Sequence, residues 1–194
     1  TKKSFTKWNL VKRYAKKIFE KFDLCIVSNK ETESYLKILG ARNIKNYGNL
    51  KFSSSKINFN NKLNSSLLEK MQNRKVWCAS STHAPEEVFC AKVHLNIKKK
   101  YKNILTIIIP RHINRVKSIK QKLKKLDLKV VNYNSLNKFN ENTDILLVDV
   151  FGETSKFFKI SKCVFLGGSL IKHGGQNPIE AARAGCKVYH GPYI

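Results

Sequence analysis

The 194-residue sequence predicts an α/β protein built on parallel β-sheets. Short runs of Ile, Val and Leu alternate along it with segments whose apolar residues recur at helical spacing. Each run is apolar throughout, which is typical of strands that helices cover on both faces. Because the strand and helix patterns alternate repeatedly, we expect a parallel sheet with helical crossovers, as in a Rossmann-like domain.

Residues 1–50 are predicted to be the C-terminal part of a first Rossmann-like domain. Apolar residues at helical spacing predict a basic amphipathic helix over residues 7–22, with its apolar stripe facing a core. A strand, a helix that Gly40 ends and a second strand are expected after it, over residues 24–29, 30–40 and 43–49.

Residues 51–66 are rich in Ser, Asn and Lys and show no apolar period, so they are predicted to be a linker. Residues 67–194 are predicted to be a second Rossmann-like domain. Its expected strands cover residues 76–81, 103–110, 128–133, 144–150, 162–168 and 186–191. Its expected helices cover residues 85–101, 113–126, 154–160 and 177–185. The final "GPYI" falls in a predicted loop, and we expect this domain to be truncated at its end.

The formal net charge of +25, from 38 Lys and Arg against 13 Asp and Glu, is compatible with a nucleic-acid or anionic-membrane partner. The basic residues are mostly Lys and are spread along the whole chain beside many Asn and Ile. A solvated Lys-rich surface therefore explains the charge equally well. The sequence contains no RRM signature, zinc-finger spacing or basic zipper, and a nucleic acid is not an expected partner.

Cysteine usage indicates neither a disulfide framework nor a zinc site. The five cysteines are scattered and form no C-x-x-C pair. We expect them to be free and to serve as small buried side chains in a reducing cytosol. No apolar run reaches the ~20 residues that span a bilayer, and no signal peptide begins the chain.

Candidate site residues lie in the loops that directly follow the predicted strands. Ligands of open parallel sheets bind beyond the carboxyl ends of the strands. Four polar or glycine-rich loops occur there: "SSTHAPEE" (80–87), "PRH" (110–112), "DVFGE" (149–153) and "GGSLIKHGGQNP" (167–178). We expect these loops to converge on one crevice.

The segment "GGSLIKHGGQNPIEAARAG" (167–185) carries the most specific signal. Its two Gly-Gly pairs allow close backbone approach or positive φ. Pro178 suits a first helical turn, which places Gln176 and Asn177 at the N-cap, where free N–H groups attract a phosphate or carboxylate. Glu180 then lies in the first turn, where it can accept hydrogen bonds from a sugar diol. No Walker A or G-x-G-x-x-G motif occurs, which argues against a nucleoside triphosphatase and a dinucleotide oxidoreductase.

This segment, together with "SSTHAPEE", "IIIPRHINR", "VDVFGE" and "YGNLKF", resembles the 3-deoxy-D-manno-octulosonic acid (Kdo) transferases of lipopolysaccharide biosynthesis. The resemblance covers nearly the whole chain and implies a GT-B glycosyltransferase, which has two Rossmann-like domains. It implies transfer of Kdo from CMP-Kdo to a lipid A precursor, without a metal or cofactor. The implied location is the cytoplasmic face of the bacterial inner membrane, with the anionic membrane surface as a further partner.

The resemblance also assigns site residues. It places Pro110 and Arg111 at the CMP, Gly152 and Glu153 along the nucleotide pocket, Gly168, Ser169, Gly174, Gly175 and Asn177 around the phosphate or the Kdo carboxylate, and Glu180 on the ribose hydroxyls. Ser81, Thr82 and His83 would form a further loop at the cleft. Asn49 would lie at the hinge between the domains and face the same cleft.

No catalytic base is assigned. In the family, the carboxylate that acts as general base lies near the first glycine-rich loop of the N-terminal domain, and this sequence does not contain that region. We therefore expect this chain to be inactive alone. Loop histidines such as His83, His112 and His173 more often hydrogen-bond or pack than act as a base.

Five other polar residues can serve either structure or chemistry. His94 and His190 are expected to be structural. Asp149 is equally well explained as a ligand or as the cap of a turn. Glu86 and Glu87 are expected to serve the first turn of their helix, where the dipole favours acids.

Two other functions stay open at this point. Another GT-B nucleotide-sugar enzyme, such as a UDP-sugar transferase or epimerase, would keep the glycine-rich loop and Glu180. A basic nucleic-acid-binding module would depend on the net charge instead of the crevice.

Overall fold

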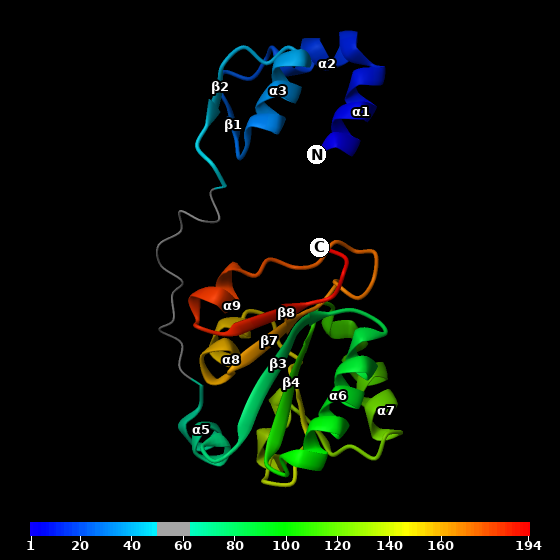
Figure 1. Ribbon diagram of the computed structural model, residues 1–194, viewed down its shortest axis with the longest axis vertical. Coiled ribbons are helices and arrows are strands. Elements are labelled where there is room, and N and C mark those ends of the chain that lie inside the picture. The colour runs from blue at the N-terminus through cyan, green and yellow to red at the C-terminus, as the bar shows by residue number, and fades with distance from the viewer. Residues whose placement is uncertain (50–62) are drawn as a thin grey trace. The chain divides into compact units, whose positions relative to one another are not determined.

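The computed structural model describes residues 1–49 and 63–194, which form two compact units, Thr1–Lys56 and Ile57–Ile194 (Figure 1). Most of the predicted linker, residues 51–66, lies outside the described residues. Its last residues are described, and they belong to the second unit. Leu63 is buried, and Ser65 begins a helix that packs into the core of that unit, so the prediction of a linker as far as residue 66 is wrong at its end.

The N-terminal unit contains one βαβ arrangement. Its elements are α1 (Lys2–Leu10), α2 (Lys12–Phe19), β1 (Cys25–Val27), α3 (Lys30–Ile38) and β2 (Ile44–Asn46). Strands β1 and β2 pair in parallel, with Cys25 opposite Ile44. A parallel pair joined by a helix is what the sequence pattern predicted for this region.

The prediction of a single helix over residues 7–22 is wrong, because the chain forms two helices, α1 and α2, that are separated at Val11. The backbone of Val11 is not helical (φ −116°, ψ 43°). Trp8 lies edge-on to Phe19, with ring centroids 5.6 Å apart, and Phe5 stacks on Tyr35 of α3 with ring centroids 4.3 Å apart. These aromatic contacts favour the break over a straight helix. The apolar period continues on both sides of Val11, so periodicity could not reveal it.

The C-terminal unit is a six-stranded parallel sheet with the strand order β5-β6-β4-β3-β7-β8. Its strands are β3 (Lys75–Thr82), β4 (Ile104–Pro110), β5 (Val130–Asn132), β6 (Ile145–Leu147), β7 (Cys163–Leu166) and β8 (Lys187–His190). Its helices are α5 (Ser65–Met71), α6 (Glu86–Lys100), α7 (Val116–Lys124), α8 (Thr154–Ile160) and α9 (Ile179–Arg183), with short 3₁₀ turns at Ile113–Arg115 and Tyr133–Lys138. The predicted strands are present in a parallel sheet, and their observed bounds are in most cases shorter.

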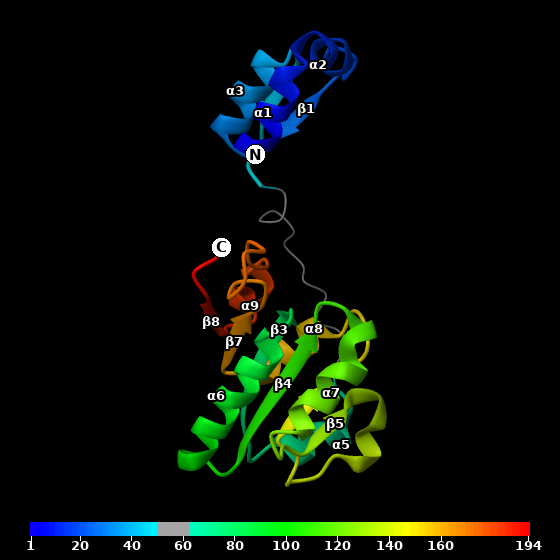
Figure 2. The same ribbon diagram turned by 90° about the vertical axis from the view of Figure 1, so that its right-hand side faces the viewer.

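Helices cover both faces of this sheet (Figure 2). On one face α6 and α7 enclose an apolar core, and on the other α5, α8 and α9 enclose a second. In β4, Leu105, Ile107 and Ile109 belong to the second core, while Ile104 and Ile108 belong to the first. An alternating strand with two apolar faces needs an uninterrupted apolar sequence, which explains the run that predicted it.

Buried polar groups join three strands and α6 at the amino end of the sheet. Asp144, immediately before β6, accepts hydrogen bonds from Lys98 Nζ at 2.5 Å and from the Lys129 N–H at 3.0 Å. His94 is fully buried and lies 3.3 Å from Asp144 Oδ1 and 2.8 Å from Thr106 Oγ1. Although burial by itself raises the pKa of Asp144, these hydrogen bonds hold the pKa well below its ordinary value. His94 is therefore structural, as predicted.

The cysteines that the structure describes are free, and three of them (Cys78, Cys90 and Cys186) are buried. Burial raises the pKa of the Cys78 and Cys90 thiols, which keeps them protonated at neutral pH. This confirms the prediction of small buried side chains for these three. Among the described helices, none has the length and apolar character needed to cross a membrane.

Candidate functional site

The loops after β3, β4 and β7 meet at the carboxyl edge of the sheet. The Arg111 N–H, after β4, donates to the Thr82 carbonyl of β3 at 3.0 Å, and the Gly167 N–H, after β7, donates to the Ser80 carbonyl at 2.8 Å. The loop after β6 follows the strand next to β4. Strand β3 lies between β4 and β7. The chain continues from β3 to β4 on one side and later returns to β7 on the other side. Such a switch point forms a ligand crevice in open α/β sheets.

Glu86 joins two of these loops through its buried carboxylate. Its Oε2 accepts the N–H groups of His83 at 2.8 Å and of Gly168 at 2.7 Å. Its Oε1 accepts the N–H groups of Ser169 at 3.1 Å and of Leu170 at 3.0 Å. Glu86 lies in the first turn of α6, as predicted, but the prediction did not include its contacts with the loop after β7. Glu86 lies on the helix that follows β3, and it holds the glycine-rich loop that follows β7.

The glycine-rich loop needs glycine for two reasons, close packing against the neighbouring loop and positive φ. A Cβ on Gly167 would lie 2.3 Å from the Ser81 carbonyl oxygen, so the loop after β3 could not pack there. Gly168, Gly174 and Gly175 have φ of 72°, 102° and 69°, a region that other residues rarely adopt. The glycines thus serve close packing against β3 and the sharp path of the loop, as the sequence indicated.

Ser169 lies in this loop but is not available to a ligand. It is fully buried, its N–H is held by Glu86, and its Oγ donates to the Leu166 carbonyl and accepts the Gly191 N–H at 2.9 Å. Its expected contact with phosphate or carboxylate is therefore wrong. Ser169 instead connects the ends of β7 and β8.

Helix α9 begins at Ile179, one residue later than the sequence suggested, with Pro178 at its N-cap. Asn177, which was expected at the N-cap, lies one residue before it, and its Oδ1 accepts the Ile179 N–H at 3.1 Å. Glu180 is exposed in the first turn. Because α9 has five residues, its dipole is weak, and a ligand here would depend on side chains.

The loops after β4 and β6 combine exposed and buried positions. Pro110 is buried at the end of β4, while Arg111 is exposed just beyond it. Gly152 is exposed with φ of 80°. Glu153 pairs with Lys156 and accepts a hydrogen bond from the Tyr133 hydroxyl at 3.4 Å. Burial, then the charge of Glu153, raises the pKa of Tyr133, so this phenol stays a donor.

Asp149 and Glu87 both have partners within the chain. The sequence leaves the role of Asp149 open and assigns Glu87 to the first turn of its helix. Asp149 Oδ1 accepts the Asn134 N–H at 3.0 Å, and its Oδ2 accepts the Asn132 side-chain amide at 3.0 Å. Glu87 is buried and binds both terminal nitrogens of Arg115, at 2.8 and 3.1 Å. Asp149 thus holds the turn after β5, which favours the capping explanation.

The loop after β3 brings a strained residue and a histidine to the crevice. Ser81 has φ of 54°, and the pairing of β3 with β4 shifts register between Ser80 and Thr82. Thr82 Oγ1 and His83 Nε2 are buried, and neither has a hydrogen-bond partner among the described residues. Burial, then the neighbouring His173, lowers the pKa of His83.

Asn49 is exposed in the N-terminal unit, three residues after β2. Its expected position facing the crevice concerns the arrangement of the two units and stays a prediction. Within residues 1–49 and 63–194, no group of three or more His, Cys, Asp and Glu side chains is arranged to hold a metal ion.

Comparison with known proteins identifies relatives for both units. Residues 1–54 match the family model of 3-deoxy-D-manno-octulosonic-acid transferase (kdotransferase). The chain is 34% identical over 192 residues to the 3-deoxy-D-manno-octulosonic acid transferase of Rickettsia prowazekii, which covers 98% of this chain and 41% of that protein. The transferase of the same name from Aquifex aeolicus is 30% identical over 190 residues, covering 98% and 49%. The chain thus spans less than half the length of these relatives.

A solved structure resembles the C-terminal unit. The crystal structure of the C-terminal CMP-Kdo binding domain of WaaA from Acinetobacter baumannii superposes with a TM-score of 0.61 at 26% identity, covering 66% of this chain and 69% of that one. The C-terminal unit therefore has the Rossmann-like fold of one half of a GT-B glycosyltransferase.

Proposed function

Because the chain belongs to the 3-deoxy-D-manno-octulosonic-acid transferase family, we propose that residues 63–194 form the half of such an enzyme that holds the CMP-Kdo donor. The similarity to a solved CMP-Kdo binding domain carries this proposal. The convergence of the loops after β3, β4 and β7 at the switch point supports it. In the proposed site Arg111, Gly152, Glu153, Gly174, Gly175, Asn177 and Glu180 surround the nucleotide, with Pro110, Gly168 and Ser81 to His83 shaping the crevice.

In the complete enzyme, Kdo passes from CMP-Kdo to a lipid A precursor by direct displacement at the anomeric carbon. The acceptor hydroxyl oxygen forms the new bond and gives its proton to the general base expected in the N-terminal domain, while the bond from the anomeric carbon to the phosphate oxygen breaks and CMP leaves with that electron pair. The N-terminal domain presents the acceptor, and this unit holds CMP. Arg111 is a cation exposed at the crevice and can stabilise charge on the leaving phosphate.

Binding of CMP tests the donor assignment. We expect the 194-residue chain to bind CMP more tightly than UDP in a calorimetric titration, because the site is proposed to accept one phosphate and a cytosine. Equal or tighter binding of UDP would support another GT-B nucleotide-sugar enzyme instead. Tight binding to DNA or RNA with a steep salt dependence, and no affinity for CMP, would point to a nucleic-acid-binding module.

Substitution Glu180→Ala is expected to weaken CMP binding about 10- to 100-fold, because a carboxylate that accepts ribose hydroxyls makes charge-assisted hydrogen bonds. The melting temperature should change little, since Glu180 is exposed. The control Glu141→Ala removes an exposed acid in the turn before β6, at the opposite edge of the sheet, and should leave CMP affinity unchanged. An unchanged affinity with a lowered melting temperature for Glu180→Ala would assign Glu180 to its helix alone.

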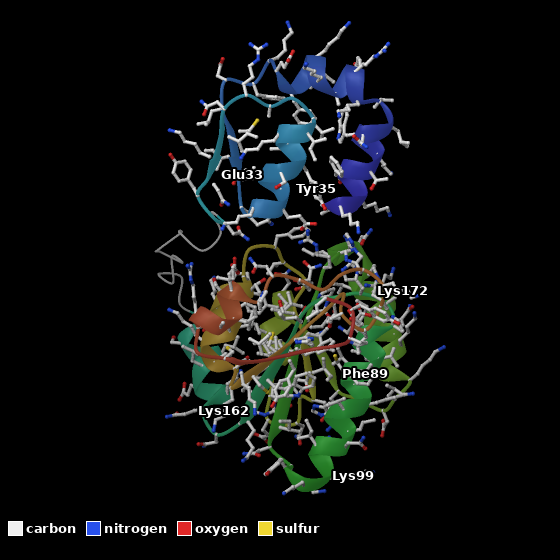
Figure 3. The ribbon with its side chains drawn as sticks, turned by 45° about the horizontal axis from the view of Figure 1, so that its top comes forward. Glu33, Tyr35, Phe89, Lys99, Lys162 and Lys172 are labelled. Carbon is white, nitrogen blue, oxygen red and sulfur yellow. The ribbon has the colours of Figure 1, made fainter. Side chains whose placement is uncertain are left out.

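The basic surface is proposed to dock the enzyme on an anionic membrane. Lys99, in the last turn of α6, and Lys172, in the glycine-rich loop, are exposed at opposite ends of the C-terminal unit (Figure 3). We expect the chain to sediment with vesicles that contain phosphatidylglycerol and to be released by salt, because the attraction is screened within about 8 Å at physiological ionic strength. Equal, salt-independent sedimentation with neutral phosphatidylcholine vesicles would contradict this.

A further inference from the structure

Three histidines from three different loops meet at the donor crevice. The His83 ring, after β3, lies beside the His173 ring of the glycine-rich loop, with centroids 4.3 Å apart and planes 33° apart. The His112 ring, after β4, lies edge-on to His83 at 5.7 Å. A Cβ on Gly168 would lie 3.5 Å from His173 Nδ1 and 3.6 Å from His83 Cδ2. The rings of His83 and His173 therefore line the bare backbone of Gly168.

His83 has a ring nitrogen whose hydrogen-bonding capacity is unused. The residue is 9% exposed, and its buried Nε2 has no partner in the described part of the chain. A buried polar nitrogen without a partner is costly unless a ligand or water completes it. His112 and His173 are exposed, so the cluster opens to solvent on one side. A ligand group can reach it there.

The charged groups around His83 come from each element packed against it. Burial lowers its pKa most, and the charges of His173, His112 and Arg115 lower it too, whereas Glu86 of α6 raises it. The neighbouring imidazoles of His83 and His173 cannot both take a proton without repelling each other. An anion placed between them removes this repulsion. Protonation of the cluster and binding of an anion therefore favour each other.

We propose that His83 and His173 form the phosphate subsite of the donor crevice, where their imidazole N–H groups donate to the phosphate of CMP and binding takes up a proton. This inference rests on the proposed function and names the residues that hold the phosphate. Ser169 and the N–H groups that Glu86 already accepts are occupied within the chain, so the donors that lie near Gly168 are the two imidazoles and the side-chain amide of Gln176. Because an anion beside His83 favours the protonated form of its ring, CMP binding then weakens as pH rises.

The test compares CMP with cytidine, which lacks the phosphate, by calorimetric titration at about pH 6 and about pH 8. His173→Ala is expected to weaken CMP about 10-fold, because an imidazole N–H that donates to a phosphate makes a charge-assisted hydrogen bond. Cytidine affinity should stay the same. Because the phosphate of CMP itself titrates in this range, the quantity that matters is the difference between the native chain and the variant.

Two further variants make the result decisive. His173 is exposed, so His173→Ala should fold, and His83→Gln with its melting temperature tests the buried partner. The control His190→Ala removes a histidine at the end of β8 whose Nδ1 donates to the Gly191 carbonyl at 2.7 Å, and it should leave CMP binding unchanged. CMP binding that His173→Ala and His83→Gln leave unaltered at both pH values would overturn this inference while the donor assignment stands. Equal loss of cytidine and CMP would also overturn it, and a native chain that binds no CMP would overturn both proposals.

Discussion

Glu86→Ala is expected to remove about 3–5 kcal/mol of the free energy of unfolding and to weaken CMP binding more than about 100-fold. The substitution leaves four buried N–H groups without an acceptor, those of His83, Gly168, Ser169 and Leu170. The loops after β3 and β7 then lose the group that holds them together at the crevice. Glu86→Gln keeps the shape but turns one oxygen into a donor that faces N–H groups, and it should give a smaller loss of both quantities. Urea unfolding and calorimetric titration of CMP measure the two effects.

The neighbouring Glu87 provides the matched control. It is equally buried on the same turn of α6, and its bidentate ion pair with Arg115 contributes to stability. Glu87→Gln should therefore destabilise the chain by an amount comparable to Glu86→Gln, while CMP affinity falls much less, because Glu87 does not contact the loop after β7. If both variants lose CMP affinity in the same proportion as stability, Glu86 contributes to folding alone and has no particular effect on the donor loop.

Asp144→Asn is expected to lower the free energy of unfolding by about 3 kcal/mol at neutral pH without changing CMP affinity. The substitution removes a buried charge that Lys98 and the Lys129 N–H bind and that lies beside His94. The site is at the amino end of the sheet, opposite the crevice, so the donor loops should keep their positions. Urea unfolding at several pH values, with CMP titrated at neutral pH, gives both numbers.

The pH dependence of this difference has a definite sign. The pKa of Asp144 is depressed in the folded chain, so its contribution is fully present above the ordinary carboxyl pKa of about 4 and is lost as pH falls below that value. The native chain and Asp144→Asn should therefore converge in stability under acid conditions. Ser118 on α7 offers a control, because its hydroxyl donates to the Arg115 carbonyl at the surface. The difference in stability between the native chain and Ser118→Ala should not depend on pH. A difference that persists unchanged in acid would contradict the role of this carboxylate.

Much of the fold follows from local patterns in the sequence. The apolar runs of β3, β4, β6 and β7 exist because each strand faces two cores, and that requirement is visible without coordinates. The break at Val11 and helix α5 escaped prediction for one reason. Aromatic contacts to Phe19 and burial of Leu67 against the second core involve partners that no local period can reveal.

The candidate site divides in the same way. The positions of the loops after the strands were predictable, since the carboxyl ends of parallel strands share one edge. The glycines of residues 167–175 indicated a constrained backbone. Glu86, by contrast, carried no sequence signal beyond an acid at a helix start. Its partner Gly168 is 82 positions away and becomes a neighbour through the pairing of β3 with β7.

The sequence by itself thus determined the α/β class, the edge of the sheet where the candidate loops meet and the resemblance to Kdo transferases, because these depend on residue type and on spacing along the chain. The tertiary structure alone decided which polar groups are available there. The Ser169 hydroxyl is bonded to Leu166 and Gly191 and the Asp149 carboxylate to the turn after β5, whereas His83 Nε2 has no partner among the described residues. The physical reason is that each buried donor or acceptor must find a partner, and strand order, which spacing does not encode, determines whether that partner is the chain or a ligand.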